Sequence, residues 1–238
     1  MPAGRASWVP DEVASAGREN LDADHVARYD DKMDAGAAAE VAMLFERGLP
    51  DRPTVVDLGA GTGQFTIAVA SRAGRVVAVD VSPVMLERLR ANVANARLAN
   101  VECIAGGFLT YEHEGAAADL VYSRYALHHL PDFWKAVALA RIARMLAPGG
   151  VFRLSDVVYG FDAADAASRI EAWVRANASA SVGDGWTRAE LEEHVRDEHS
   201  TFTWLLEPML TRAGFVIEAA EYAEDGMDAQ YVCRRAPS

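Results

Sequence analysis

The chain has 238 residues, a length that is sufficient for one sizeable hydrophobic core. Of these residues 51% are hydrophobic and 24% are charged, and the formal net charge is −12. This acidic balance argues against a nucleic-acid partner, because binding to phosphates requires a basic face. No apolar run reaches the roughly 18 residues of a membrane helix and residues 1–10 lack the apolar core of a signal peptide, so we expect no membrane partner. Cys103 and Cys233 fall within predicted strands and have no metal-site spacing, which indicates reduced, buried residues in a cytoplasmic protein.

The first 50 residues are predicted to form an N-terminal helical segment, or lid, ahead of a domain that spans residues 51–238. Residues 1 to about 20 are polar, contain Pro and Gly, and are expected to lie loosely on the surface. A short helix is expected over Asp22–Lys32. A longer helix over Ala35–Arg47 ends where a glycine and a proline follow.

Strands and helices then alternate along the chain. The strands are predicted over Thr54–Leu58, Arg75–Asp80, Val101–Ala105, Asp119–Ser123 and Val151–Val158. The intervening helices are predicted over Gln64–Arg72, Pro83–Arg97 and Asp132–Leu146. These strands are continuous apolar runs without polar alternation, which is typical of a parallel sheet with helices on both faces.

The alternation stops after the fifth predicted strand. Residues 160–199 contain two helical segments, Ala163–Ala178 and Arg188–Asp197, and are predicted to form a helical cap insertion. The last elements are predicted to be a helix and two strands, at Ser200–Ala213, Phe215–Tyr222 and Met227–Arg234. A short polar turn joins the two strands, which predicts an antiparallel hairpin.

The most informative stretch runs from Val55 to Phe65, where a buried strand leads through a glycine-rich turn into a helix. Glycines let the backbone approach a ligand closely because they have no Cβ atom. About one βα unit later a second buried strand ends in Asp80, whose carboxylate can accept hydrogen bonds from a ribose diol. The two features together predict a nucleoside-binding corner.

The spacing of the glycines distinguishes two classes of cofactor. A dinucleotide fingerprint reads G-x-G-x-x-G, whereas this turn reads G-x-G-x-G and has Gln64 in place of the third glycine. Asp57, two residues before the first glycine, can reach an ammonium group. A cofactor with a cationic amino-acid end therefore fits better than a pyrophosphate.

This glycine-rich block closely resembles the first motif of class I S-adenosylmethionine-dependent methyltransferases, and Val79–Ser82 resembles the motif that follows it. The resemblance extends from about Thr54 to the C-terminus. It implies a Rossmann-like, seven-stranded, mostly parallel sheet with helices on both faces. The C-terminal antiparallel hairpin would supply the last two strands, an ending that a nicotinamide-binding sheet lacks.

The resemblance also implies which residues bind S-adenosyl-L-methionine. They are Tyr29, Asp57, Gly59, Ala60, Gly61, Thr62, Asp80, Val81, Met85, Gly107, Phe108, Ser123 and Arg124. Tyr29 is expected over the sulfonium, since an aromatic face attracts a cation, although it can equally be an ordinary helix aromatic. Related enzymes often carry an Asp where Gly107 stands. Adenine recognition must then use backbone amides, a side chain from elsewhere, or water.

The segment Ser123–Leu130 resembles the S-x-x-x-L-H-H-L segment of many small-molecule methyltransferases, including those of quinone biosynthesis. Adjacent residues on a helix do not share a face and no third ligand is near in sequence, so we expect no metal site. At least one of the two histidines is expected to be structural. His128, Tyr29 and Asp156 are candidate catalytic bases, and Asp156 is alternatively a structural partner.

We therefore predict a methyltransferase that acts on an O, N or C nucleophile of a small molecule and releases S-adenosyl-L-homocysteine. The alternatives are a non-catalytic binding protein of the same fold and an NAD(P)-dependent oxidoreductase. Trp173, Trp186 and Trp204, after the fifth strand, are expected to cover the acceptor side of the sheet and to select the acceptor. The acceptor and the oligomeric state are left open.

Overall fold

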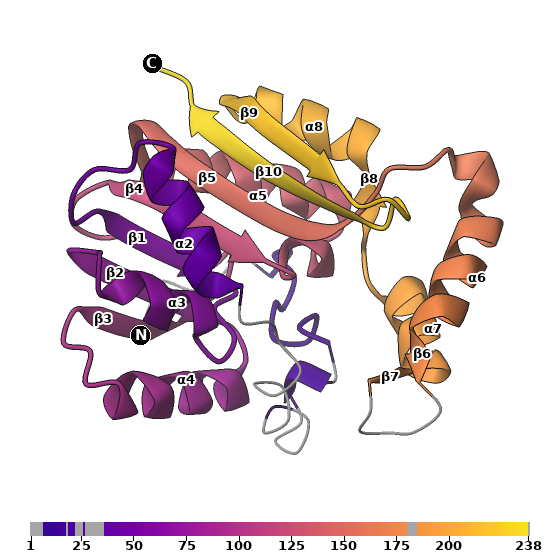
Figure 1. Cartoon of the computed structure of the whole chain (residues 1–238), viewed down its shortest axis with the longest axis horizontal. Coiled ribbons are helices and arrows are strands. Elements are labelled where there is room, and N and C mark those ends of the chain that lie inside the picture. The colour runs from indigo at the N-terminus through magenta and orange to yellow at the C-terminus, as the bar shows by residue number, and fades with distance from the viewer. Residues whose placement is uncertain (1–6, 18, 22–25, 27–35, 180–184, 238) are drawn as a thin grey trace.

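The computed structural model describes residues 7–17, 19–21, 26, 36–179 and 185–237. Its centre is a sheet in which the strands follow the order β3-β2-β1-β4-β5-β10-β9 (Figure 1). These strands are β1 (Thr54–Leu58), β2 (Arg75–Asp80), β3 (Val101–Ala105), β4 (Ala118–Arg124), β5 (Leu146–Tyr159), β9 (Phe215–Tyr222) and β10 (Asp228–Arg235). β1 to β5 are parallel, and β10 is antiparallel to both of its neighbours. The predicted mostly parallel sheet with a C-terminal hairpin is confirmed.

Helices cover both faces of this sheet, which is why the strands are apolar on both sides. The helices are α2 (Ala37–Glu46), α3 (Gln64–Ala70), α4 (Pro83–Asn95), α5 (Asp132–Met145) and α8 (Thr203–Arg212). Val55 and Val76 pack with α2 and α3, whereas their neighbours Val56 and Val77 face the cluster that includes α5 and α8. All four valines are fully buried. Successive residues of a strand point to opposite faces, so continuous apolar runs satisfy both layers.

A helical cap follows β5 and lies beyond the carboxyl end of that strand (Figure 1). We use the name cap for η3 (Ala163–Asp165), α6 (Ala166–Asn177), β6 (Ala178–Ser179), β7 (Trp186–Thr187) and α7 (Arg188–Asp197). A capping box between Thr187 and Glu190 starts α7. The chain then returns through β8 (Thr201–Phe202), which pairs with the end of β5. The cap is thus tied to the sheet at both of its ends.

The structure differs from the sequence-based expectation at the N-terminus. Residues expected to lie loosely on the surface pack against the body of the protein, and Glu12 and Ala16 are buried. The Glu12 carboxylate accepts hydrogen bonds from the Leu109 amide and the Thr110 hydroxyl, which compensates for its burial. Most of the short helix predicted over Asp22–Lys32, including Tyr29, lies outside the described residues.

Another, smaller difference concerns the elements around α5. β5 begins at Leu146, earlier than predicted, because Leu146 already pairs with Ala118 across the sheet. α5 begins at Asp132 after Pro131, which occupies the N-cap position, and no side chain caps this helix. Within the part of the chain that the structure describes, none of the helices has the length and hydropathy that crossing a membrane requires.

Candidate active site

The glycine-rich turn between β1 and α3 has a left-handed backbone at Gly59, Gly61 and Gly63, with φ of 75°, 54° and 93°. A Cβ on Gly59 would lie 2.3 Å from Ala126 Cβ, and one on Gly63 would lie 2.2 Å from Leu89 Cδ1. A Cβ on Gly61 would meet nothing within 4 Å. The outer glycines therefore permit close packing within the protein, whereas the open side of Gly61 faces a cavity.

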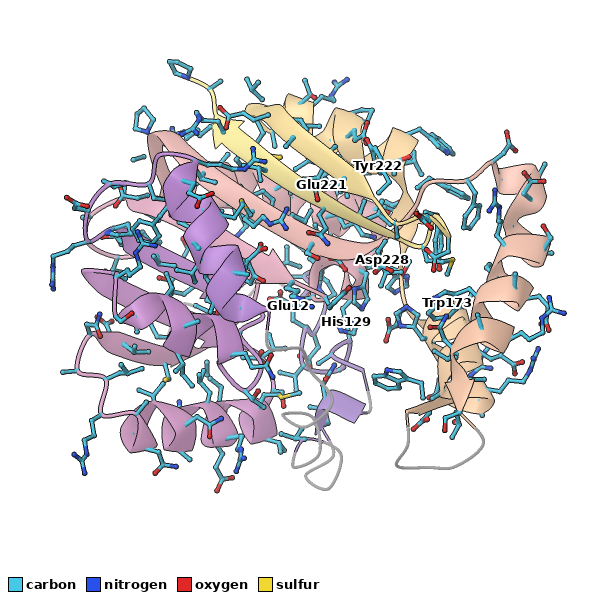
Figure 2. All side chains as sticks on the ribbon, viewed as in Figure 1. Glu12, His129, Trp173, Glu221, Tyr222 and Asp228 are labelled. Carbon is cyan, nitrogen blue, oxygen red and sulfur yellow. The ribbon has the colours of Figure 1, made fainter. Side chains whose placement is uncertain are left out.

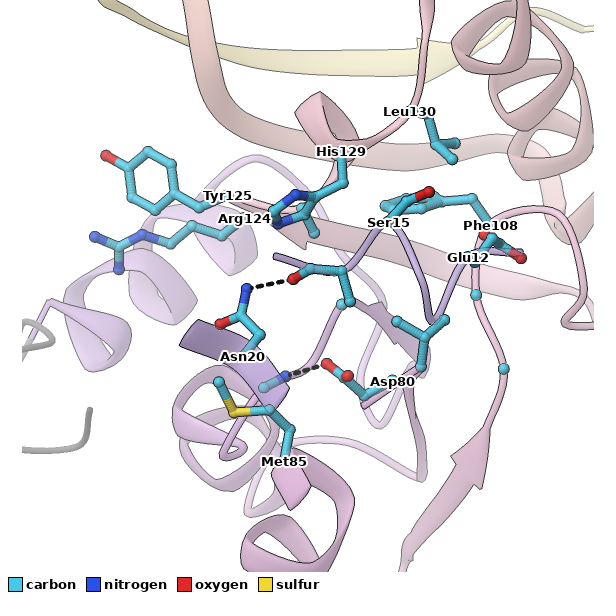
Figure 3. A pocket seen from close by; sticks show the side chains of 17 residues that line it. Glu12, Ser15, Asn20, Asp80, Met85, Phe108, Arg124, Tyr125, His129 and Leu130 are labelled. Carbon is cyan, nitrogen blue, oxygen red and sulfur yellow. Dashed lines mark hydrogen bonds between the residues drawn. The ribbon is translucent and has the colours of Figure 1, made fainter. Parts of the chain in front are cut away.

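Asp80, at the end of β2, lies directly beside this turn. One carboxylate oxygen accepts a hydrogen bond from the Gly61 amide at 2.8 Å (Figure 3). The other accepts one from the Ser82 amide, also at 2.8 Å. Burial raises the pKa of Asp80, although the backbone hydrogen bonds oppose this effect. Each carboxylate oxygen keeps a second lone pair, so Asp80 can still accept hydrogen bonds from a diol.

The cavity at this corner, which we call the cofactor cavity, is lined by most of the predicted cofactor-binding residues (Figure 3). These are Gly59, Gly61, Asp80, Val81, Met85, Gly107, Phe108 and Arg124. Four other predicted residues are not among its lining: Asp57, Ala60, Thr62 and Ser123. The Thr62 and Ser123 hydroxyls are buried and have no hydrogen-bond partner among the described residues.

Asp57 is buried beneath the turn, where it accepts a hydrogen bond from the Thr66 hydroxyl at 2.6 Å. Burial raises the pKa of Asp57 to about 7; the Thr66 hydrogen bond opposes the rise and the nearby charge of Asp80 adds to it. In this arrangement Asp57 holds the first turn of α3. Its predicted contact with an ammonium group stays a prediction.

A second and larger cavity, of about 670 Å³, lies between the sheet and the cap. We call it the acceptor cavity. Trp173 and Trp186 line it from the cap side, and His129 and Asp228 line it from the side of the sheet (Figure 2). Trp204 is 59% exposed and is not among its lining, so the expectation that this residue faces the acceptor is wrong. Trp204 instead stacks on Phe202 at the surface.

The two cavities adjoin each other. Four residues line both of them, namely Ser15, Asn20, Tyr125 and His129. Tyr125 has a left-handed backbone with φ of 49°, which is uncommon for a residue other than glycine. Such strain is concentrated at functional sites, where the surrounding structure holds it in place.

His128, on the short helix η2 (Leu127–His129), lies between two carboxylates. Its Nδ1 is hydrogen-bonded to Asp156, and its Nε2 lies 3.0 Å from a carboxylate oxygen of Glu198. Burial alone would lower the pKa of His128, but the charges and hydrogen bonds of Asp156 and Glu198 outweigh burial and raise it to about 10. Asp156 is not among the lining of either cavity, so its contacts are those of a structural partner.

The adjacent His129 does share a face with His128, contrary to the expectation. Their ring centroids are 4.3 Å apart, and Nδ1 of His129 lies 4.0 Å from Glu198. Burial and the neighbouring His128 lower the pKa of His129 to about 3. The short 3₁₀ turn η2 places consecutive residues about 120° apart, so the two rings meet because both side chains turn toward Glu198 and not because of the helix geometry.

Residues 55–150 match the family described as a methyltransferase domain. This span contains the glycine-rich turn, Asp80, Gly107 and the strand that leads to His128. Residues 55–150 therefore form a methyltransferase domain. The resemblance to the class I S-adenosylmethionine-dependent methyltransferases is thereby confirmed, and S-adenosylmethionine is the cofactor that this family implies.

The chain is similar to methyltransferases of several other organisms. The chain is 33% identical over 162 residues to the arsenite methyltransferase of Halobacterium salinarum. The aligned region covers 65% of this chain and 40% of that protein. The chain is also 33% identical over 129 residues to the trans-aconitate 2-methyltransferase of Variovorax paradoxus, covering 53% of this chain and 46% of that protein. The chain thus spans less than half the length of these curated relatives. A SAM dependent methyltransferase of Aquifex aeolicus has the same fold, with a TM-score of 0.62 at 16% identity over 90% of this chain and 99% of that chain.

The methyltransferase domain lacks a side chain at Gly107, and the structure shows what lies there instead. A Cβ on Gly107 would be 2.5 Å from Oε1 of Glu12, whose carboxylate lines the cofactor cavity. Glu12 is 6% exposed and is held by the Leu109 amide at 3.0 Å and the Thr110 hydroxyl at 2.9 Å. Glu12 could not be predicted from the sequence, because nothing local in the polar N-terminal segment connects it with Gly107.

Proposed function

We propose that the protein transfers the methyl group of S-adenosylmethionine to a small molecule and releases S-adenosylhomocysteine. The observation that supports this most directly is the junction between the two cavities, where Tyr125 and His129 line both. The acceptor nucleophile must approach the methyl carbon in line with the departing sulfur. A junction of this kind lets a cofactor and an acceptor meet without either having to cross the other's site.

The cofactor is placed by the residues of the cofactor cavity. Asp80 accepts hydrogen bonds from the ribose diol, Val81 and Phe108 contact the adenine, and Glu12 accepts from the adenine amino group. Because the sulfonium already activates the methyl group, the protein supplies mainly alignment and exclusion of water. Well-oriented reactants gain roughly 7–11 kcal/mol in this way.

The lining of the acceptor cavity favours a neutral or cationic acceptor. Acidic side chains contribute to it from both sides: Glu190, Glu193, Asp197, Glu198 and Asp228. Charge complementarity disfavours a tricarboxylate such as the trans-aconitate named for one relative. The indoles of Trp173 and Trp186 supply apolar surface and faces that attract cations. A small-molecule acceptor and a cytoplasmic location remain proposals that rest on the sequence.

The need for a general base depends on the acceptor. An amine that enters neutral needs no base, whereas an oxygen or carbon nucleophile has to lose a proton. Both ring nitrogens of the candidate His128 are engaged, by Asp156 and by Glu198. His128 therefore has to exchange one of these partners before it can receive a proton. Of the other two candidates, Tyr29 lies outside the described residues and Asp156 is not among the lining of either cavity.

Calorimetry tests the proposed function. We expect S-adenosylmethionine and S-adenosylhomocysteine to bind with micromolar affinity and NAD(P)H to give no heat of binding. Turnover is then measured as release of S-adenosylhomocysteine with a panel of amine, hydroxyl and carbon acceptors. Binding of NAD(P)H alone would favour the oxidoreductase, which Gln64 and the β9–β10 ending argue against. Cofactor binding without turnover on any acceptor would favour the non-catalytic alternative.

Asp80→Asn is expected to weaken S-adenosylmethionine binding about tenfold and to lower the melting temperature, because its NH2 group must face the Gly61 or the Ser82 amide, both of which donate to the carboxylate. The substitution keeps the shape of the side chain but removes its charge, and a hydrogen bond to a charged group contributes about 1.5–3 kcal/mol. The exposed Asp165→Asn serves as the matched control and should bind like the wild type. Equal affinities of the two variants would remove Asp80 from the ribose site.

Trp186→Ala is expected to change the order of acceptor preference in the panel while cofactor affinity stays the same. The indole lines only the acceptor cavity, so its loss enlarges the space for the acceptor. Trp204→Ala removes an indole that does not line the cavity and should leave the preference unchanged. If both variants keep the wild-type order, the cap does not select the acceptor.

A further inference from the structure

Three side chains of the acceptor cavity form a cluster with the chemistry of a metal site. His128 and His129 come from η2, and Glu198 directly follows α7 of the cap. Their ligand-type atoms all lie within 4.8 Å of one another. Two ligands of one tetrahedral zinc ion are about 3.3–3.6 Å apart, because each bond is about 2.0–2.2 Å long. Side-chain movements of about 1 Å would therefore bring the three groups to bonding distance.

The surroundings of His128 match those of a metal-binding histidine. Its Nδ1 is hydrogen-bonded to the buried Asp156, which also accepts a hydrogen bond from the His128 amide at 3.1 Å. This contact fixes the ring so that Nε2 faces Glu198. Histidines that bind metals commonly hold the other ring nitrogen against a carboxylate in this way, which fixes the tautomer and the ring orientation.

An independent observation comes from His129. Its Nδ1 is buried and has no hydrogen-bond partner among the described residues. Buried polar atoms normally have a partner, so an unsatisfied imidazole nitrogen directed at Glu198 indicates that a partner is absent. Nδ1 of His194, on α7, contacts the same carboxylate and is available as a fourth ligand.

We propose that His128, His129 and Glu198, with His194 as the fourth ligand, bind a divalent transition-metal ion of the zinc type. Imidazole ligands suit zinc and its transition-metal neighbours, whereas magnesium and calcium prefer oxygen ligands. The ion would join the cap to η2, since two of its ligands come from each. Because His129 lines both cavities, the ion would lie where cofactor and acceptor meet. A role of the ion toward the acceptor rests on the proposed function, but its binding does not.

The test uses the full-length chain without an affinity tag, dialysed against a chelator and then against buffer. Cobalt(II) is added as a spectroscopic probe, and zinc is measured by equilibrium dialysis and elemental analysis. We expect one ion per chain, visible absorption of bound cobalt, and displacement of cobalt by zinc but not by magnesium. His129→Ala and Glu198→Gln should each weaken zinc binding at least tenfold. Asp156→Asn, which removes the charge that orients His128, should weaken it about 10–100-fold.

His113→Ala is the matched control, because His113 bonds Tyr111 and the Ala116 carbonyl and takes no part in the cluster. It should bind zinc like the wild type. Circular dichroism and thermal unfolding on the same samples show which variants are folded, and the less buried His194→Ala decides if the other two are not. Calorimetry with S-adenosylmethionine is carried out on the wild type alongside. A wild type that binds no ion, or folded variants that bind like the wild type, would overturn the metal site. Retained S-adenosylmethionine binding in that case would leave the proposed function standing.

Discussion

Gly61→Val is expected to abolish S-adenosylmethionine binding, lowering affinity more than 100-fold, in a protein that still folds. Gly61 has φ of 54°, a conformation that a β-branched residue adopts only with strain. The left-handed conformation costs an ordinary residue about 1–2 kcal/mol, which is less than the roughly 5–15 kcal/mol stability of a typical domain. The new side chain meets no protein atom within 4 Å at its Cβ, so it would extend into the cofactor cavity.

The neighbouring glycines give the contrast that makes this prediction specific. A Cβ on Gly63 would collide with Leu89 inside the protein, so Gly63→Ala should lower the melting temperature before it affects the ligand. Gly61→Ala should lower affinity less than Gly61→Val does. Calorimetry and thermal unfolding on all three variants measure both effects. Wild-type affinity in Gly61→Val would mean that the turn is structural and that the cofactor lies elsewhere.

The parts of the fold that the sequence predicts best are those with local causes. β1, β2 and β3 occupy the predicted residues, because each is a short apolar run bounded by polar or glycine residues. The turn that follows β1 is equally local, since its glycines and Asp80 are separated by a single βα unit. The cofactor cavity could therefore be predicted largely from motif and spacing.

What the sequence does not predict depends on contacts between distant segments. Glu12 lies in a polar stretch without any helical or strand pattern, and its partners Leu109 and Thr110 come almost a hundred residues later. Glu198 likewise joins His128 and His129 only because the cap folds back over the sheet edge. No third ligand is near the two histidines in the sequence, so the sequence alone predicts no metal site.

The N-terminal segment has a larger part in the site than its composition suggests. Ser15 and Asn20 line both cavities, and the backbone carbonyl of Asn20 accepts a hydrogen bond at 2.5 Å from the hydroxyl of Ser82, which follows Asp80 closely in the chain. Glu12 lines the cofactor cavity as well. Ordering of this segment and formation of the cofactor site are therefore linked, and a defect in either should appear in the other.

Glu12→Ala is expected to weaken S-adenosylmethionine binding about 10–100-fold, since a hydrogen bond to a carboxylate contributes about 1.5–3 kcal/mol. The neighbouring Asp11→Ala, which removes an exposed carboxylate outside the cavity, should leave affinity unchanged. Gly107→Asp by itself should also weaken binding. Its Cβ would lie 2.5 Å from Oε1 of Glu12 and 2.6 Å from Val81 Cγ1, and two carboxylates would then compete for one place.

Combining the two substitutions gives the decisive measurement. Glu12→Ala removes the obstructing carboxylate, so an aspartate introduced at Gly107 can occupy the vacated place once Val81 has adjusted. The double variant should therefore bind S-adenosylmethionine at least tenfold more tightly than Gly107→Asp does alone, which is the non-additivity expected of groups in contact. Calorimetry over the four proteins measures this coupling. Additive losses, or no loss in Glu12→Ala, would show that Glu12 only anchors the loop at Leu109 and that adenine is recognised by other groups.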